Sequence, residues 1–236
     1  MSDLLSIVIP VFNERNTVGE VVRRVRETSL PEGFERELIV VDVGSRDDTA
    51  KVLNGIDDST VRIIHHDHNR GQGAAVRTAL EYVRGHIVLV QDADLEYDPD
   101  DIHELIKPIV AGRADVVLGN RFRTARPVMP LTSVVLDRTV SLAACALFNT
   151  TLSDVECAYK AFNAEVLKSV EIEANDFSYG PEVIAKLLRL DARFVEVPVR
   201  YTGRRTGGKF AAMDRWRAVQ ALTYNRFRPA RRLQVK

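Results

Sequence analysis

The sequence predicts an α/β fold in which helices flank a mostly parallel central sheet. Short apolar runs with the length of buried strands alternate with helix-like segments over residues 1–120, which is the pattern of strand–helix–strand units. The 236 residues, 45% hydrophobic and 28% charged, have the composition of an ordinary globular protein. No internal repeat or linker divides them, so we expect a single domain.

The first half is predicted from apolar runs and helical spacing. Residues 4–11 form a continuous apolar strand, and a helix that begins at Asn16 carries valines at helical spacing. The turn at 44–49 leads into a second helix, and residues 71–84 form a third. Asp98 and Pro99 are expected to begin a fourth helix, because proline lacks an N–H and the N–H of the first helical position has no partner within the helix. Further strands are expected at 38–41, 61–64, 87–91 and 116–118.

The second half is less regular. We expect helices at 132–148, 181–189 and 213–227, and a strand at 194–199. Asp137 and Arg138 interrupt the apolar face of the helix at 132–148. The best apolar stretch, 140–148, is far shorter than the roughly 20 residues that cross a bilayer, so no transmembrane span is expected.

Charge is distributed unevenly along a chain whose formal net charge is zero. Residues 200–236 hold eleven Lys and Arg and one acid, Asp214, whereas the preceding residues hold 22 bases and 32 acids. The basic end predicts contact with phosphates, a membrane surface or the acidic body, although a solvated helix with a frayed end fits equally well. No nucleic-acid-binding motif accompanies it, so no nucleic-acid partner is expected.

Cysteine usage and the N-terminal residues indicate the compartment. Cys145 and Cys157 form no Cys-x-x-Cys pair, and no signal peptide is visible at the start of the chain. We therefore expect a reducing, cytoplasmic setting.

Polar segments follow four of the predicted strands. Ligands of open α/β sheets bind outside the carboxyl ends of the strands. That rule brings residues 12–14, 42–45, 92–96 and 120–121 to one rim.

Asp92-Ala93-Asp94 is the most informative of these segments. Two carboxylates just past a buried strand repel each other unless a positive charge lies between them. Carboxylate oxygens suit Mg²⁺ or Mn²⁺, which usually share their coordination shell with substrate phosphates. Glu96 is a candidate third ligand through water. The alternative is that Asp94 caps a helix and Asp92 is solvated.

Other cofactor motifs fit poorly. The turn after the first strand lacks the glycines of a dinucleotide-binding turn. An EF-hand that begins at the first Asp fails, because its sixth position is Tyr97 where Gly is needed. A zinc site at His65, His66 and His68 lacks a Cys or a convincing ligand spacing, and a polar loop explains these residues better.

Seven segments, in order and over nearly the whole chain, resemble the family 2 nucleotide-sugar glycosyltransferases of the GT-A fold, in particular the dolichyl-phosphate mannose or glucose synthase group. The resemblance implies a nucleotide-sugar half at about 1–122, an acceptor half at about 123–228 and a basic tail at 229–236. The segments are 6–14, 40–45, 69–75, Asp92-Ala93-Asp94, Gly119-Asn120-Arg121, Ser153-Asp154 with Lys160, and 196–199 followed by Tyr201, Arg204 and Lys209.

The resemblance also implies roles for single residues. Asp92 and Asp94 would hold Mg²⁺ or Mn²⁺ and Arg121 would approach the donor, in an inverting transfer of a hexose from a GDP- or UDP-sugar to a polyprenyl or dolichyl phosphate. The residues implied to bind the nucleotide donor are Pro10, Phe12, Asn13, Glu14, Val41, Asp42, Val43, Ala93, Arg204 and Lys209.

Two positions depart from the family pattern. Val43 stands where the family usually has a second Asp that contacts the nucleotide, and Gln72 replaces a usual Lys. Adjacent side chains of an extended segment point in opposite directions, so Asp42 cannot take over from the missing Asp. The base end of the site is therefore where this chain is expected to differ.

The protonation state of the attacking group distinguishes two classes of sugar acceptor. A lipid phosphate is already anionic, whereas a sugar hydroxyl needs a general base, for which Asp154 and Glu156 are candidates. Each carboxylate is alternatively a loop residue or a salt-bridge partner. The basic end and the helix at 132–148 favour a polyprenyl phosphate at the cytoplasmic face of a membrane. A transferase acting on a hydroxyl acceptor and a non-catalytic nucleotide-sugar binder remain alternatives.

Overall fold

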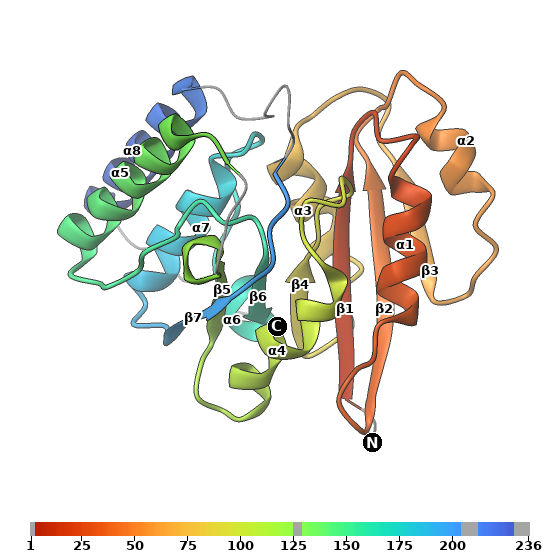
Figure 1. The fold of residues 1–236 in the computed structure, drawn as a ribbon, viewed down its shortest axis with the longest axis horizontal. Helices are drawn as coiled ribbons and strands as arrows, with labels where there is room; N and C mark the ends of the chain where they lie inside the picture. The colour runs from red at the N-terminus through yellow and green to blue at the C-terminus, as the bar shows by residue number, and fades with distance from the viewer. Residues whose placement is uncertain (1–2, 125–128, 204–211, 229–236) are drawn as a thin grey trace.

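A seven-stranded sheet runs through the molecule (Figure 1). The computed structural model describes residues 3–124, 129–203 and 212–228. Its strands are β1 Asp3–Val11, β2 Phe34–Asp42, β3 Val61–His65, β4 Ile87–Val90, β5 Val116–Asn120, β6 Lys160–Asn163 and β7 Phe194–Pro198. Its helices are α1 Val18–Glu27, α2 Thr49–Asn54, α3 Gln72–Leu80, α4 Ile102–Val110, α5 Leu131–Phe148, α6 Ala164–Lys168, α7 Tyr179–Leu188 and α8 Ala212–Phe227, with short 3₁₀ helices η1 Pro99–Asp101 and η2 Arg121–Arg123.

The strand order is β3-β2-β1-β4-β6-β5-β7. Every neighbouring pair is parallel except those of β6, which is antiparallel to both β4 and β5. The predicted mostly parallel sheet is therefore confirmed. Strand β6 and the short helix α6 were not predicted. The four residues of β6 start with Lys and end with Asn and carry no strand pattern.

Helices cover both faces of the sheet because side chains alternate along each strand. Ile7 and Ile9 of β1 belong to one buried cluster with Val18 and Val21 of α1. Val8, between them, belongs to the opposite cluster, which includes residues of α3, α5, α7 and α8. The valines predicted at helical spacing in the first helix are all buried.

Helix α5 is longer than the apolar stretch at 140–148 from which no transmembrane span was expected. It has 18 residues, 22% of which are buried, and it is long and apolar enough to cross a membrane by length and composition. In the described structure α5 packs against α7 and α8.

The first turn of α3 is packed tightly against the segment before α7. Gly71 has a φ of 85°, which favours glycine. The backbone N–H of Gly73 donates to the carbonyl oxygen of Asn175 at 2.8 Å. A Cβ on Gly73 would lie 2.2 Å from the carbonyl oxygen of Ala174. This contact fixes where the two segments meet.

We expect Gly73→Ala to lower the free energy of unfolding by about 2 kcal/mol or more, because its Cβ must displace backbone atoms. Gly55→Ala is the matched control, since Gly55 has ordinary helical geometry and its added Cβ would approach no atom closer than 3.4 Å. The control should stay within about 1 kcal/mol of the wild type in urea unfolding. Equal stabilities of the two variants would contradict the packing described.

Candidate functional site

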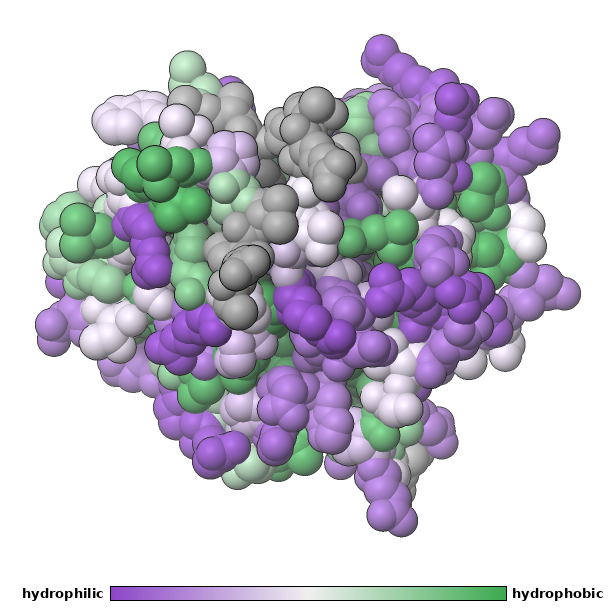
Figure 2. Space-filling model, viewed as in Figure 1, coloured by the Kyte–Doolittle hydropathy of each residue, from purple (hydrophilic) through white to green (hydrophobic). Residues whose placement is uncertain are grey.

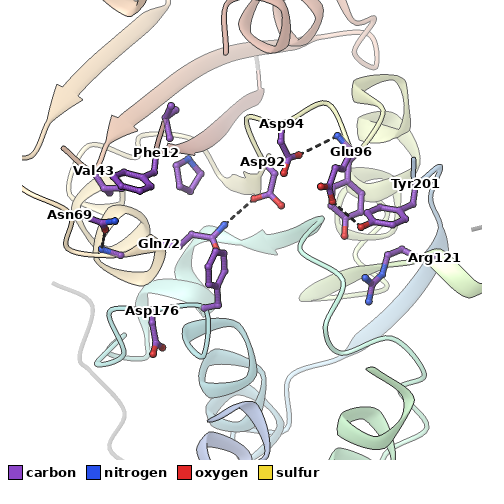
Figure 3. A pocket seen from close by; sticks show the side chains of 15 residues that line it. Phe12, Val43, Asn69, Gln72, Asp92, Asp94, Glu96, Arg121, Asp176 and Tyr201 are labelled. Carbon is purple, nitrogen blue, oxygen red and sulfur yellow. Dashed lines mark hydrogen bonds between the residues drawn. The ribbon is translucent and has the colours of Figure 1, made fainter. Parts of the chain in front are cut away.

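The carboxyl ends of β1, β4 and β5 open onto a cavity of about 270 Å³ (Figure 3). Phe12 and Val43 lie at one end of it, Asp92 and Asp94 in the middle, and Arg121 at the other end. The rim predicted from the strand ends is thus assembled in the structure. The predicted site residues that line the cavity are Pro10, Phe12, Val43, Asp92, Asp94, Glu96 and Arg121.

The two aspartates after β4 are held by neighbours on different elements. Gln72, the first residue of α3, donates from Nε2 to Oδ1 of Asp92 at 2.9 Å. The backbone N–H of Glu96 donates to Oδ1 of Asp94 at 3.2 Å. Leu95 between them has a φ of 63°, a conformation that L residues rarely adopt outside functional or strained turns. The backbone is therefore folded sharply to present both carboxylates.

Glu96 is engaged elsewhere in the cavity wall. Its Oε2 accepts a hydrogen bond from the Tyr201 hydroxyl at 2.8 Å, and Tyr201 pairs with Tyr97 in an isolated bridge. Among the described residues, no three His, Cys, Asp or Glu side chains are grouped so as to hold a metal ion. Asp92 and Asp94 are hard oxygen donors that suit Mg²⁺ or Mn²⁺, which complete their shell with water and phosphate oxygens. The residues fit such an ion when a diphosphate brings the remaining ligands.

The end of the cavity near β2 is apolar. Val43 is 3% exposed and faces the cavity together with Phe12. Asp42 points away from it: its Oδ1 accepts the N–H of Ser45 at 2.9 Å, and its Oδ2 lies 3.1 Å from Nδ1 of His65. The two neighbours do point in opposite directions, so Asp42 does not replace the Asp that the family usually has at position 43.

Several residues expected to bind the nucleotide build the turn behind the cavity. Asn13 accepts the N–H of Arg46 at 2.8 Å, and Glu14 donates its N–H to Thr49 Oγ1 at 2.8 Å. These bonds tie the turn after β1 to the turn after β2. Arg204 and Lys209 lie outside the described residues. Two further predicted residues lie in the hydrophobic core: Val41 and Ala93.

His65, the last residue of β3, and His66, which follows it, make local contacts. Nε2 of His65 lies 3.2 Å from Oδ1 of Asn54, and its Nδ1 contacts Asp42 as described above. His66 Nε2 lies 3.0 Å from the Thr78 hydroxyl of α3. Each histidine therefore joins β3 to a neighbouring helix.

Arg121 is the centre of a buried ion network. It donates from Nε and Nη2 to the two carboxylate oxygens of Asp154 at 2.9 and 2.6 Å. Nη2 also lies 3.0 Å from Asp137 of α5, and Asp137 accepts from Arg215 of α8 at 3.0 Å. Burial alone would lower the pKa of Arg121, but the attraction of Asp154 outweighs it and raises that pKa well above the usual range. The guanidinium stays charged at the end of the cavity.

Asp154 does not line the cavity. It is fully buried, and both its oxygens accept N–H groups of Arg121. Glu196 of β7 accepts the backbone N–H groups of Ser153 and Asp154, both at 2.8 Å, and fixes the loop. The geometry therefore gives Asp154 the task of orienting Arg121.

Three lining residues escaped the sequence analysis. Tyr97 packs between Tyr159 and Tyr201, with ring centroids 5.3 and 5.1 Å away. Asp176 and Phe177 come from the loop before α7, which carries no motif. The tyrosine follows Asp92-Ala93-Asp94 closely enough to have been considered, whereas nothing in the sequence places the loop before α7 at the rim.

The fold and the carboxylate-centred rim define an α/β protein of the nucleotide-binding type, and comparison with known proteins makes this specific. Residues 6–136 match the family model of Glycosyl transferase family 2. The chain belongs to this family, and the predicted resemblance is confirmed. A solved structure, glucosyl-3-phosphoglycerate synthase from Mycobacterium tuberculosis with Mn²⁺, UDP and phosphoglyceric acid, matches with a TM-score of 0.73 at 21% identity. The match covers 96% of this chain and 80% of that one, and the GT-A fold is confirmed.

Two curated relatives are each 28% identical to the chain. Dodecaprenyl-phosphate galacturonate synthase of Rhizobium johnstonii is 28% identical over 206 residues, which cover 86% of this chain and 60% of the relative. Polyprenol monophosphomannose synthase of Mycolicibacterium smegmatis is 28% identical over 212 residues, which cover 85% of this chain and 78% of the relative. The chain spans about a third to a half of the length of other curated relatives.

We expect Asp154→Asn to lower the free energy of unfolding by about 3–5 kcal/mol, because it leaves a buried guanidinium short of negative charge. Urea unfolding measures the effect. Glu20→Gln removes one partner of the exposed pair between Glu20 and Arg23 and should change stability little. A small effect of Asp154→Asn, similar to that of the control, would show that the buried charge of Arg121 does not depend on Asp154 for compensation.

Proposed function

We propose that the chain transfers a hexose from a nucleoside-diphosphate sugar to a polyprenyl phosphate with inversion at the anomeric carbon. The observation that carries the proposal is the placement of Asp92 and Asp94 between an apolar pocket end and the buried cation of Arg121. An apolar end suits a nucleobase, and a cation beside two metal-binding carboxylates suits a diphosphate.

The chain's own residues would orient the donor and stabilise the leaving group. Phe12 and Val43 would contact the base, while Arg121 supplies fixed positive charge at the diphosphate end. A divalent cation held by Asp92 and Asp94 would neutralise the charge that develops on the leaving diphosphate. Since Arg121 is already oriented by Asp154, no reorganisation is needed when that charge develops.

Asp154, one of the two carboxylates considered as a general base, is not placed for that role. Both of its oxygens are occupied by Arg121 and it is not on the cavity wall. A phosphate acceptor is anionic at neutral pH and needs no base. Two relatives are named for transfer to dodecaprenyl phosphate and polyprenol phosphate, which supports the same acceptor class here.

A lipid acceptor requires contact with a membrane, and helices α5 and α8 offer the surface for it. They pack side by side, and apolar side chains gather over them in Figure 2. Arg138, Arg217 and Arg226 are exposed on the same two helices and would be attracted to anionic headgroups at the cytoplasmic face. The exposed apolar residues of this pair are Leu131, Val135, Leu142, Met213, Trp216, Tyr224 and Phe227.

We expect Asp92→Asn and Asp94→Asn each to reduce sugar transfer by about a hundredfold or more, because each removes a ligand of the cation that stabilises the leaving group. Thermal shifts with UDP and GDP, with and without Mn²⁺, should show that metal-dependent nucleotide binding is lost. Asp57→Asn, at an exposed position, is the control.

The nucleotide panel also tests the apolar end and the alternatives. If both aspartate variants keep Mn²⁺-dependent binding, the proposed metal site is wrong. A Val43→Asp variant should change the preference between UDP and GDP without changing the metal dependence. Metal-dependent binding without transfer to any acceptor would favour the non-catalytic binder. Transfer to a soluble hydroxyl in preference to polyprenyl phosphate would favour the other acceptor class.

We expect Leu142→Glu and Trp216→Glu together to weaken binding to vesicles of phosphatidylcholine and phosphatidylglycerol by about tenfold or more, since each side chain would otherwise enter the headgroup region. Cosedimentation measures the bound fraction. Val110→Glu alters an exposed apolar residue of α4 and should leave vesicle binding unchanged. Equal binding by all variants would place the membrane contact elsewhere.

A further inference from the structure

A second, smaller chamber adjoins the cavity on the side of α7. Its volume is about 20 Å³, enough for one water-sized group. Gln72 and Phe177 border both the chamber and the cavity, so the two spaces share a wall. The polar side chains that face the chamber include those of Glu156 and Lys160.

Lys160 brings a buried ammonium to this chamber. The residue is 4% exposed, and as the first residue of β6 it pairs with Val90 of β4 and Leu118 of β5. Its Nζ donates to the carbonyl oxygen of Cys157. An ammonium has three N–H donors, and the described residues offer it this one acceptor. Burial lowers the pKa of Lys160, with Cys157 and Glu156 opposing the effect.

Glu156 lacks a hydrogen-bond partner altogether within the described residues. It is half-buried, and burial raises the pKa of its carboxyl to about 7 although Lys160 opposes the shift. Its carboxylate is not fully enclosed, so a bound group can reach it from the chamber. Lys160 and Glu156 are therefore a donor and an acceptor that a bound group would satisfy.

The position of the chamber indicates which group that is. Gln72 forms part of its wall and donates to Asp92, the carboxylate placed to face the diphosphate. The sugar of a nucleotide donor is bonded directly to the diphosphate, so a diphosphate at Asp92 would bring the sugar hydroxyls towards this wall. A water-sized volume admits a hydroxyl and excludes a phosphate.

We propose that the chamber binds one hydroxyl of the donor sugar, with Lys160 Nζ donating a hydrogen bond to the hydroxyl oxygen and a carboxylate oxygen of Glu156 accepting a hydrogen bond from the O–H. This inference rests on the proposed function and adds the residues that select the sugar. A site built to bond a hydroxyl strongly rejects a sugar that lacks it at that position, because the site's own polar groups are then left unpaired.

The test compares the affinity for nucleotide sugars with the affinity for the bare nucleotides. UDP, GDP, UDP-glucose, UDP-galactose and GDP-mannose are titrated by calorimetry with Mn²⁺ into the wild type, Lys160→Met and Glu156→Gln. The preferred nucleotide sugar should bind about tenfold more weakly to Lys160→Met, whereas its nucleoside diphosphate should bind unchanged. Lys168→Met is the control, since Lys168 also donates to a backbone carbonyl, that of Val83, away from the cavity.

Each other outcome has a definite meaning. Failure of every nucleotide to bind the wild type overturns the proposed function itself. Unchanged sugar affinity in both chamber variants overturns the inference, as does equal weakening of nucleotide and nucleotide sugar, which indicates a structural role. A change in the KM for polyprenyl phosphate without a change in donor affinity assigns the chamber to the acceptor and overturns its assignment to the sugar.

Discussion

The site depends on the buried ion network around Arg121. Two arginines and two aspartates balance their charges away from water, and the network joins η2, the loop at Asp154, α5 and α8. Buried pairs of this kind add little net stability compared with apolar packing, but losing one partner is costly. The network therefore holds the irregular second half of the chain in a single arrangement relative to the sheet rim.

The residues that line the cavity come from two regions of the fold. Asp92 and Asp94 follow the central strand β4, whereas Arg121 follows β5, which lies beyond β6 in the sheet. Asp176 and Phe177 come from the loop before α7. Gln72 links the two regions, since it donates to Asp92 and borders the chamber of Lys160 and Glu156. The usual Lys of the family would place a second cation there. Because Gln72 stands in place of that Lys, Lys160 supplies the positive charge in the chamber wall.

Sequence patterns predicted the parts of the structure that depend on local order. Apolar runs and helical spacing gave the alternating elements, and the strand-end rule gathered Phe12, Asp92 and Arg121 at one rim. The patterns failed where long-range packing decides. Four residues starting at Lys160 become a strand because β4 and β5 flank them, and Asp154 becomes a positioning residue because Arg121 reaches it from 33 residues away.

The antiparallel direction of β6 has an architectural consequence. In a wholly parallel sheet, side chains at the rim come from strand ends and the turns that follow them. Because β6 runs the opposite way, its first residue and the loop before it arrive at the same rim from the other direction. Asp154 lies in that loop and bonds Arg121, so the loop is tied to the cation at the end of the cavity. The cavity therefore receives its buried cation through a segment that reaches the rim from the opposite direction to the strand that precedes the aspartates.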